Sequence, residues 1–230
     1  MNWCKIDVMG KADVIKRWKP ELKKLGFVYR RSMFLYRKTE DQAIQFGVSI
    51  QRSIHEARFK VHVTIILKNP LIDRPELEVL LGGNISREGA RVHETNSTWW
   101  PENELGEALM FVKVHAMHWF DEHRVIQHLV DLFEEAISQR IGPEYVLQPI
   151  DESKYPAWYR EWHPPVDTAE RRVGPLYLYQ TAVLHYLNGD HANAIARTKD
   201  WMEVIGPSDT VWRAKAENQL ATLTKATRLN

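Results

Sequence analysis

The amino-acid sequence predicts an α+β fold, in which an N-terminal helix packs on an antiparallel sheet and is followed by helices and an all-helical C-terminal subdomain. Near the N-terminus, apolar residues recur at helical spacing. Two later segments instead alternate apolar and polar residues, as expected for half-buried strands. Toward the C-terminus, the turn signals Asn188-Gly189-Asp190 and Gly206-Pro207-Ser208 separate three helix-length segments.

The first helix is predicted over residues 11–25. Its apolar stripe consists of Val14, Ile15, Trp18, Leu22 and Leu25. Gly26 follows at the position of a left-handed C-terminal cap. Pro20 lies inside the pattern and is expected to kink or divide the helix, because proline lacks the backbone donor and clashes with the preceding turn.

The predicted sheet begins with residues 27–38, which form a hairpin broken near Arg31-Ser32. Residues 44–51 and 59–68 then alternate strictly, and the short polar turns between these runs favour antiparallel neighbours. One sheet face is apolar and is expected to lie under the first helix. The other is polar, and serves either as a binding surface or as the seat of acidic helices; it carries Gln45, Gln51, Lys60, His62 and Lys68.

The remaining chain is predicted to be irregular over residues 69–100, with a further strand near 90–93. A helix follows over 102–119, and another is capped by Asp121 and ends at Gly142-Pro143. The domain organisation is therefore a sheet domain over residues 1–141, a proline- and aromatic-rich strap over 142–175, and a helical subdomain over 176–230 that packs on the first domain.

Composition favours a soluble intracellular protein. The first ten residues lack the apolar core of a secretory signal, and no run approaches the length of a membrane span. The single cysteine, Cys4, cannot form an intrachain disulfide, which fits a reducing cytoplasm. We therefore expect a cytoplasmic location without membrane contact.

The net charge of +1 hides an asymmetry along the chain. Residues 1–68 hold 15 Lys and Arg against 6 Asp and Glu, a net charge of +9, whereas residues 69–230 hold 16 against 24, a net charge of −8. The basic segment either faces an acidic partner or nucleic acid, or packs on the acidic segment of its own chain. Both readings stay open at the level of sequence.

The N-terminal half resembles a bacterial family called domain of unknown function 4304, over about residues 11–135. The resemblance rests on the first helix, Leu25-Gly26-Phe27, the Phe34-Leu35-Tyr36-Arg37 strand, the Gln45-to-Gln51 strand, the Trp99-Trp100 pair and Trp119-Phe120-Asp121. It implies an α+β fold in a bacterial protein and supplies no catalytic residue.

The tail, over about residues 176–227, resembles a tetratricopeptide-type helical hairpin. The turn at Asn188-Gly189-Asp190 closes one helix, and Ala194 and Ala196 stand where small residues let paired helices approach. Only about one repeat is visible, and one repeat cannot bury its own apolar face. This favours a helical subdomain docked on the rest of the chain.

Motifs for catalysis are missing from the sequence, which has no phosphate-binding loop and no nucleophile elbow. We therefore predict no catalytic residue and no cofactor. His115 and His118 are three residues apart on a predicted helix and are the weak candidates for a metal site. These two histidines are the basis of a further hypothesis, in which the chain is a metal-dependent enzyme.

Candidate binding residues come from the basic strands and from one tryptophan pair: Arg30, Arg37, Arg52, Lys60, Trp99 and Trp100. Tyr29 or Tyr36 beside these cations would provide stacking for single-stranded RNA. The leading prediction is a non-enzymatic protein-binding or regulatory protein. The alternative is nucleic-acid binding through the basic sheet face.

Overall fold

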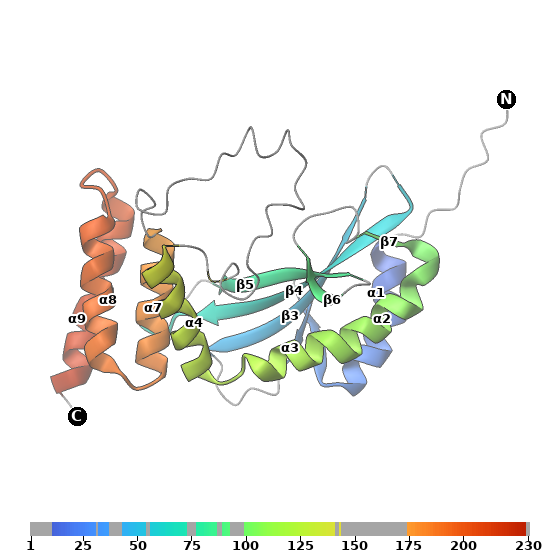
Figure 1. Cartoon of the computed structure of the whole chain (residues 1–230), viewed down its shortest axis with the longest axis horizontal. Coiled ribbons are helices and arrows are strands. Elements are labelled where there is room, and N and C mark those ends of the chain that lie inside the picture. Colours follow the sequence, from blue (N-terminus) through green and yellow to red (C-terminus); the bar gives the residue numbers. More distant parts are fainter. Residues whose placement is uncertain are drawn as a thin grey trace. The chain divides into compact units, whose positions relative to one another are not determined.

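The computed structural model describes residues 11–30, 32–36, 43–53, 56–72, 77–86, 89–92, 99–140, 143 and 174–228. Contacts within the chain divide it into two compact units. We call residues 1–68 and 77–124 the sheet unit, and residues 69–76 and 125–230 the helical unit. Figure 1 labels most of the helices and strands. Among the described residues, no helix is long and apolar enough to cross a membrane.

The strands of the sheet unit pair antiparallel throughout, which confirms the predicted sheet. They are β1 (Phe27–Arg30), β2 (Met33–Tyr36), β3 (Ile44–Arg52), β4 (Arg58–Lys68), β5 (Leu77–Ser86), β6 (Gly89–Val92) and β7 (Trp100–Pro101). Strands β1 to β6 lie side by side in chain order, and β7 also pairs with β4. Ser32 takes a left-handed φ of 65° in the tight β1–β2 connection. The hairpin break predicted at Arg31-Ser32 is thus observed.

Helix α1 (Lys11–Lys24) is one helix across Pro20, so the expected division does not occur. Lys16, whose carbonyl would accept the missing bond, is exposed, so water can satisfy it. Val14, Trp18 and Leu22 are buried and hold the helix to the unit. Gly26 has a φ of +94° and caps the helix as predicted.

Strand β5 was not expected, because the glycine pair at 82 and 83 resembled a loop signal. In the sheet, Gly82 lies opposite Thr64, and Gly83 lies opposite Val63. The long neighbour β4 supplies the pairing that the glycines themselves do not favour. The prediction of irregular structure is therefore wrong for Leu77–Ser86, whereas β6 confirms the strand expected near 90–93.

One sheet face is covered by α1 and by a second helical run. That run consists of the 3-10 turn η2 (Glu102–Glu104), α2 (Leu105–Phe111), the π turn η3 (Val112–Ala116) and α3 (Met117–Glu122). Trp18 of α1 packs edge-on against Phe59, with ring centroids 6.1 Å apart. Phe120 of α3 packs on Phe46 of β3 at 5.0 Å. Figure 1 shows these helices together beside the strands, and we call the face they cover the helix face.

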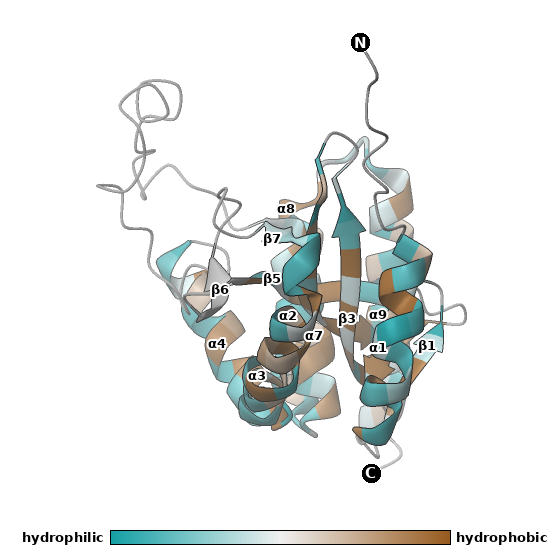
Figure 2. Ribbon diagram, turned by 90° about the vertical axis from the view of Figure 1, so that its right-hand side faces the viewer, coloured by the Kyte–Doolittle hydropathy of each residue, from teal (hydrophilic) through white to brown (hydrophobic). Residues whose placement is uncertain are grey.

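The two helical runs are also bonded to each other. The Trp18 Nε1 donates to the Leu105 carbonyl at 3.2 Å, and Lys113 Nζ pairs with Glu21 at 2.7 Å. In Figure 2, β3 alternates hydrophobic with paler or hydrophilic segments, and the outer side of α1 is largely hydrophilic. The core of this unit therefore lies between the helices and the apolar side of the strands.

The helical unit contains α4 (Ile126–Gln139), α7 (Pro175–Leu187), α8 (His191–Val204) and α9 (Thr210–Arg228), each packed on the next. We expected α4 to belong to a sheet domain ending at residue 141, but its contacts with α7 place it here. Asp121 does not cap it, since Asp121 lies within α3 and Val125 precedes α4. The expected strap over residues 142–175 lies outside the described residues, apart from 143, 174 and 175.

Helix α7 is the centre of the helical unit, because every residue from Leu178 to His185 is buried. The turn after it follows the prediction: Gly189 has a φ of +81°, and Asp190 caps α8 by accepting from the Asn193 backbone. Ala194 is buried in the helix contact, whereas Ala196 is exposed. Only the first of the two predicted small residues therefore lies between helices.

The connection between β4 and β5 also belongs to the helical unit. Asn69 is fully buried and donates to Tyr179 Oη at 2.9 Å and to Gln219 Oε1 at 3.0 Å. Its own Oδ1 accepts from the Leu71 backbone at 2.8 Å. Gln219 in turn donates to Thr198 Oγ1 at 3.1 Å. A buried polar chain therefore joins this connection to α7, α8 and α9.

Candidate functional site

The sheet side facing away from α1 and α3 carries the residues that alternate with the core positions. We call it the polar sheet face, and its members include Arg30, Met33, Gln45, Ser49, Gln51, Lys60, His62, Thr64, Lys68 and Asn84. Five of these stand in register across β1 to β5 as one row: Arg30, Met33, Ser49, His62 and Asn84. A straight row of this kind presents side chains from five strands along one line.

The row is accessible at its β1 end and through its middle. Arg30 is exposed, Ser49 and His62 are half-buried, and Asn84 is buried. A ring nitrogen of His62 lies 3.0 Å from Gln51 Oε1, in a hydrogen bond between neighbouring strands. The polar sheet face therefore offers neutral donors and acceptors, with a cation at its β1 edge.

A second feature of this face is a side chain that lies flat over a glycine. The Cβ of any other residue at Gly47 would collide with Met33 Sδ and approach Thr64 Oγ1 to 2.9 Å. Thr64 Oγ1 also donates weakly to the Gly47 carbonyl at 3.4 Å. Met33 therefore fills the space that the missing side chain of Gly47 leaves on this face.

The predicted tryptophan pair is divided between the two faces. Trp100 lies opposite Phe59 in register, is 1% exposed, and donates from Nε1 to the Ile85 carbonyl at 2.8 Å. Trp99 is half-buried, and the Lys60 ammonium lies 4.6 Å from its ring centroid. Trp100 is thus a core residue, and only Trp99 remains near the polar sheet face.

The predicted arginines differ in their surroundings. Arg52 lies opposite Phe59, and its Nε pairs with Glu102 at 3.0 Å. Arg52 therefore forms an ion pair within its own chain, which is one of the two roles that we considered for the basic segment. Arg30 is exposed on the polar sheet face. Arg37 lies outside the described residues.

The two tyrosines considered for base stacking belong to the helix face. Tyr29 packs on Phe34 with ring centroids 4.9 Å apart, and Tyr36 packs on Phe27 at 5.1 Å. Burial and the nearby Asp121 carboxylate raise the pKa of the Tyr36 hydroxyl, against a smaller opposing effect of Arg124. Neither ring is therefore presented on the polar sheet face.

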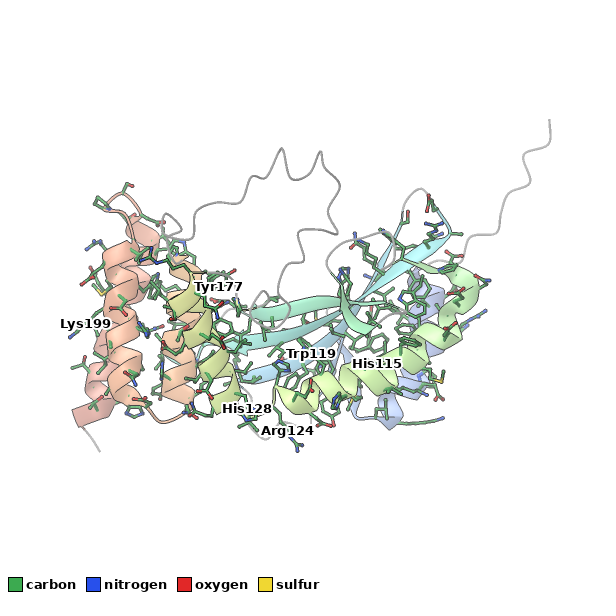
Figure 3. All side chains as sticks on the ribbon, in the orientation of Figure 1. His115, Trp119, Arg124, His128, Tyr177 and Lys199 are labelled. Carbon is green, nitrogen blue, oxygen red and sulfur yellow. The ribbon has the colours of Figure 1, made fainter. Side chains whose placement is uncertain are left out.

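The weak metal candidates do not form a ligand cluster. His118 Nε2 lies 3.2 Å from Glu122 Oε1 at an exposed position, and the His115 ring packs on Phe111 at 4.9 Å. Figure 3 labels His115 on the helical run beside the strands and His128 on α4, which belongs to the other unit. Within the described ranges, no three His, Cys, Asp or Glu residues are placed to hold a metal ion.

Sequence reasoning missed a cluster of charged residues inside the helical unit. Glu134 of α4 accepts from His185 Nε2 at 2.7 Å and from Arg197 Nε at 2.8 Å. Arg197 also bonds the second oxygen of Glu134 and reaches Asp200 at 2.8 Å. On its other side, His185 Nδ1 lies 3.5 Å from Asp190 Oδ2. His185 is therefore held between two carboxylates from different parts of the chain.

The charges in this cluster stabilise one another. Burial raises the pKa of Glu134, but hydrogen bonds from His185 and Arg197 outweigh it and lower the pKa to about 2. The hydrogen bond to Glu134 raises the pKa of Arg197. Because both Glu134 oxygens accept from these side chains, the cluster acts as a clamp between α4, α7 and α8.

No local signal could have revealed this clamp. His185 and Arg197 lie 51 and 63 positions after Glu134. Contacts of this range are set by helix packing, which the spacing of charges along the sequence does not report.

No protein-family model, curated protein or solved structure matches this chain. The resemblances to domain of unknown function 4304 and to a tetratricopeptide-type hairpin accordingly stay predictions.

Proposed function

We propose that this chain is a non-enzymatic protein-binding or regulatory protein whose partner contacts the polar sheet face. The observation that carries the proposal is the in-register row that begins at Arg30 and passes through Ser49 and His62. It lies on the side of the sheet away from α1 and α3, and its accessible members come from several strands. Such a row can contact one extended partner segment along its length.

The charges of this surface favour an acidic partner. Arg30 and Lys68 are accessible cations on this side of the described strands, Lys60 on the same side is buried, and no Asp or Glu lies on this side at the described positions. Gln45, Ser49 and Gln51 add neutral hydrogen-bonding groups. A peptide rich in Asp and Glu would be attracted by the cations and oriented by the neutral groups.

The aromatic residues favour a protein over a nucleic acid. Sheets that bind single-stranded nucleic acid stack bases on accessible aromatic rings. Tyr29 and Tyr36 pack on the helix face, and Lys60 lies over the Trp99 ring. Since Lys60 is itself only 6% exposed, its ammonium is poorly placed to contact a phosphate.

A displayed random-peptide library tests this proposal. We expect the wild-type protein to enrich acidic peptides, and the Arg30→Glu/Lys68→Glu variant to lose them because it reverses the charge of the face. Glu107→Lys is the matched control, since Glu107 is exposed on α2 and lies away from the polar sheet face. It should retain the wild-type enrichment.

A single-stranded oligonucleotide, titrated at several salt concentrations, is the competing probe. Nucleic-acid binding would weaken steeply with salt, because each phosphate contact releases a counterion. Steep binding that Arg30→Glu/Lys68→Glu abolishes, with no acidic peptide enriched, would replace the protein-binding proposal by the nucleic-acid one. If Arg30→Glu/Lys68→Glu and the control Glu107→Lys bind acidic peptides equally well, the polar sheet face is not the binding surface.

A further inference from the structure

The outer side of α9 carries a surface that the described helices of the helical unit leave largely exposed. Helix α9 buries one stripe, which includes Ala216, Gln219 and Leu223. A different side lines a shallow hollow of about 400 Å³ with Glu217, Leu220, Ala221, Thr224 and Lys225. These five residues follow the spacing of one helix face. We call them the α9 outer face.

The charges of the α9 outer face are arranged symmetrically about its middle. Glu217 lies four residues before Ala221, and Lys225 lies four residues after it, so each charge is about 6 Å along the axis from Ala221. All three residues are exposed. Within the described part of the chain, neither charge has an ion-pair partner. The helix therefore presents a negative end, an apolar middle and a positive end.

We propose that the α9 outer face binds the same face of a second copy of this chain, with the two α9 helices antiparallel and a two-fold axis at Ala221. In this arrangement Glu217 lies opposite the partner's Lys225, and Lys225 lies opposite the partner's Glu217. A two-fold interface uses the same patch on both copies, which requires a self-complementary surface. The spacing of the two charges about Ala221 meets that requirement.

The remaining residues fit the same arrangement. Ala221 has a small side chain, so the helices can approach to about 8 Å at the axis. Leu220 and Thr224 flank it and are half-buried already. A parallel pair in the same register would place Glu217 against Glu217 and Lys225 against Lys225, so charge repulsion selects the antiparallel pair.

The size of the α9 outer face determines how tightly the proposed dimer is expected to associate. One helix face buries less than the roughly 1,200–2,000 Å² of a standard stable interface. The dimer should therefore be weak, with a dissociation constant of about 1 μM or above. Because the charged pairs lie at the exposed ends, association should also weaken as salt rises.

Sedimentation equilibrium of the full chain tests the proposal, over protein concentrations from about 1 μM to about 1 mM at low salt. We expect wild-type dimers. Glu217→Lys and Lys225→Glu should each weaken association at least about tenfold, because each turns two attractive pairs into two repulsive ones. The double variant Glu217→Lys/Lys225→Glu should dimerise again, since it exchanges the charges. Lys199→Glu, at an exposed site on α8 labelled in Figure 3, should leave association unchanged.

Mixing the two single variants gives the sharpest result. Glu217→Lys and Lys225→Glu should form a mixed dimer with each other, because both pairs are again attractive. A wild-type chain that stays monomeric over the whole range overturns the proposal. So does a folded double variant that stays monomeric, or mixed single variants that do not associate. These results concern the helical unit and leave the peptide-binding test of the polar sheet face independent.

Discussion

Arg197 binds both carboxylate oxygens of Glu134, and this ion pair joins α8 to α4 although the two residues are 63 positions apart. His185 of α7 bonds the same carboxylate at 2.7 Å. Three helices therefore meet at one acidic side chain. The arrangement leads to two predictions on the stability of the helical unit.

Glu134→Gln should destabilise the helical unit by about 1–3 kcal/mol, because it leaves His185 and Arg197 without their shared carboxylate. Urea denaturation measures the change as a lower midpoint at a constant slope. Glu135→Gln is the control, since Glu135 is exposed and should change stability by less than about 0.5 kcal/mol. Equal effects of the two variants would show that the clamp does not contribute.

The same carboxylate should make stability depend on acid pH. The pKa of Glu134 is about 2 in the folded chain against an ordinary value of 4.5, so the unfolded state binds protons more readily between these values. Its stabilising effect is therefore complete above pH 4.5 and is lost as pH falls toward 2.

Comparison with Glu134→Gln isolates this effect. Glu21 also has a lowered pKa of about 2, caused first by the hydrogen bond from Lys113, and it titrates in the same range. Denaturation midpoints measured from neutral pH downward should fall less steeply in Glu134→Gln than in the wild type. Parallel curves for the two proteins would contradict the assignment.

Asn69→Ala should destabilise the helical unit more than Tyr179→Phe. Asn69 donates to both Tyr179 and Gln219 and accepts from the Leu71 backbone, whereas Tyr179→Phe removes one of these bonds. We expect about 2–4 kcal/mol for Asn69→Ala and about 1–2 kcal/mol for Tyr179→Phe. Hydrogen exchange should show the loss of protection in α7 and α9. The reverse order of the two variants would argue against the polar chain.

Gly47→Ala should destabilise the sheet unit by about 1–3 kcal/mol, because the added methyl group collides with Met33 Sδ. In a Met33→Ala background the same substitution should have a smaller effect, since the flexible side chain over Gly47 is gone. A double-mutant cycle measured by denaturation gives this coupling. Additive effects would mean that Met33 does not lie over Gly47 in solution.

Much of the sheet unit could be predicted because strand periodicity is a local property. The alternation over residues 44–51 and 59–68 predicted the helix face correctly: Ile44, Phe46, Val48 and Ile50 are all buried. The cap at Gly26 was equally readable, because glycine readily adopts left-handed backbone. The break near Ser32 was predicted, but its left-handed backbone was not. Strand β5 was missed because pairing with β4 stabilises it despite its glycines, and this pairing cannot be predicted from local sequence.

The candidate site was predicted only in part. Arg30 is exposed on the polar sheet face, but Arg52 pairs with Glu102, and Trp99 and Trp100 belong to opposite sides. A list of basic and aromatic residues cannot separate these cases. What separates them is strand register and the partner that each side chain meets.

The sequence by itself determined helix α1, strands β1 to β4, the apolar side of the sheet and the turn between α7 and α8, because these depend on neighbours a few residues away. The tertiary structure alone decided that α4 and the segment from Asn69 belong to the helical unit. It also decided that Glu134 meets Arg197. These pairings depend on packing between distant segments, and packing follows from the shapes of whole elements rather than from local spacing.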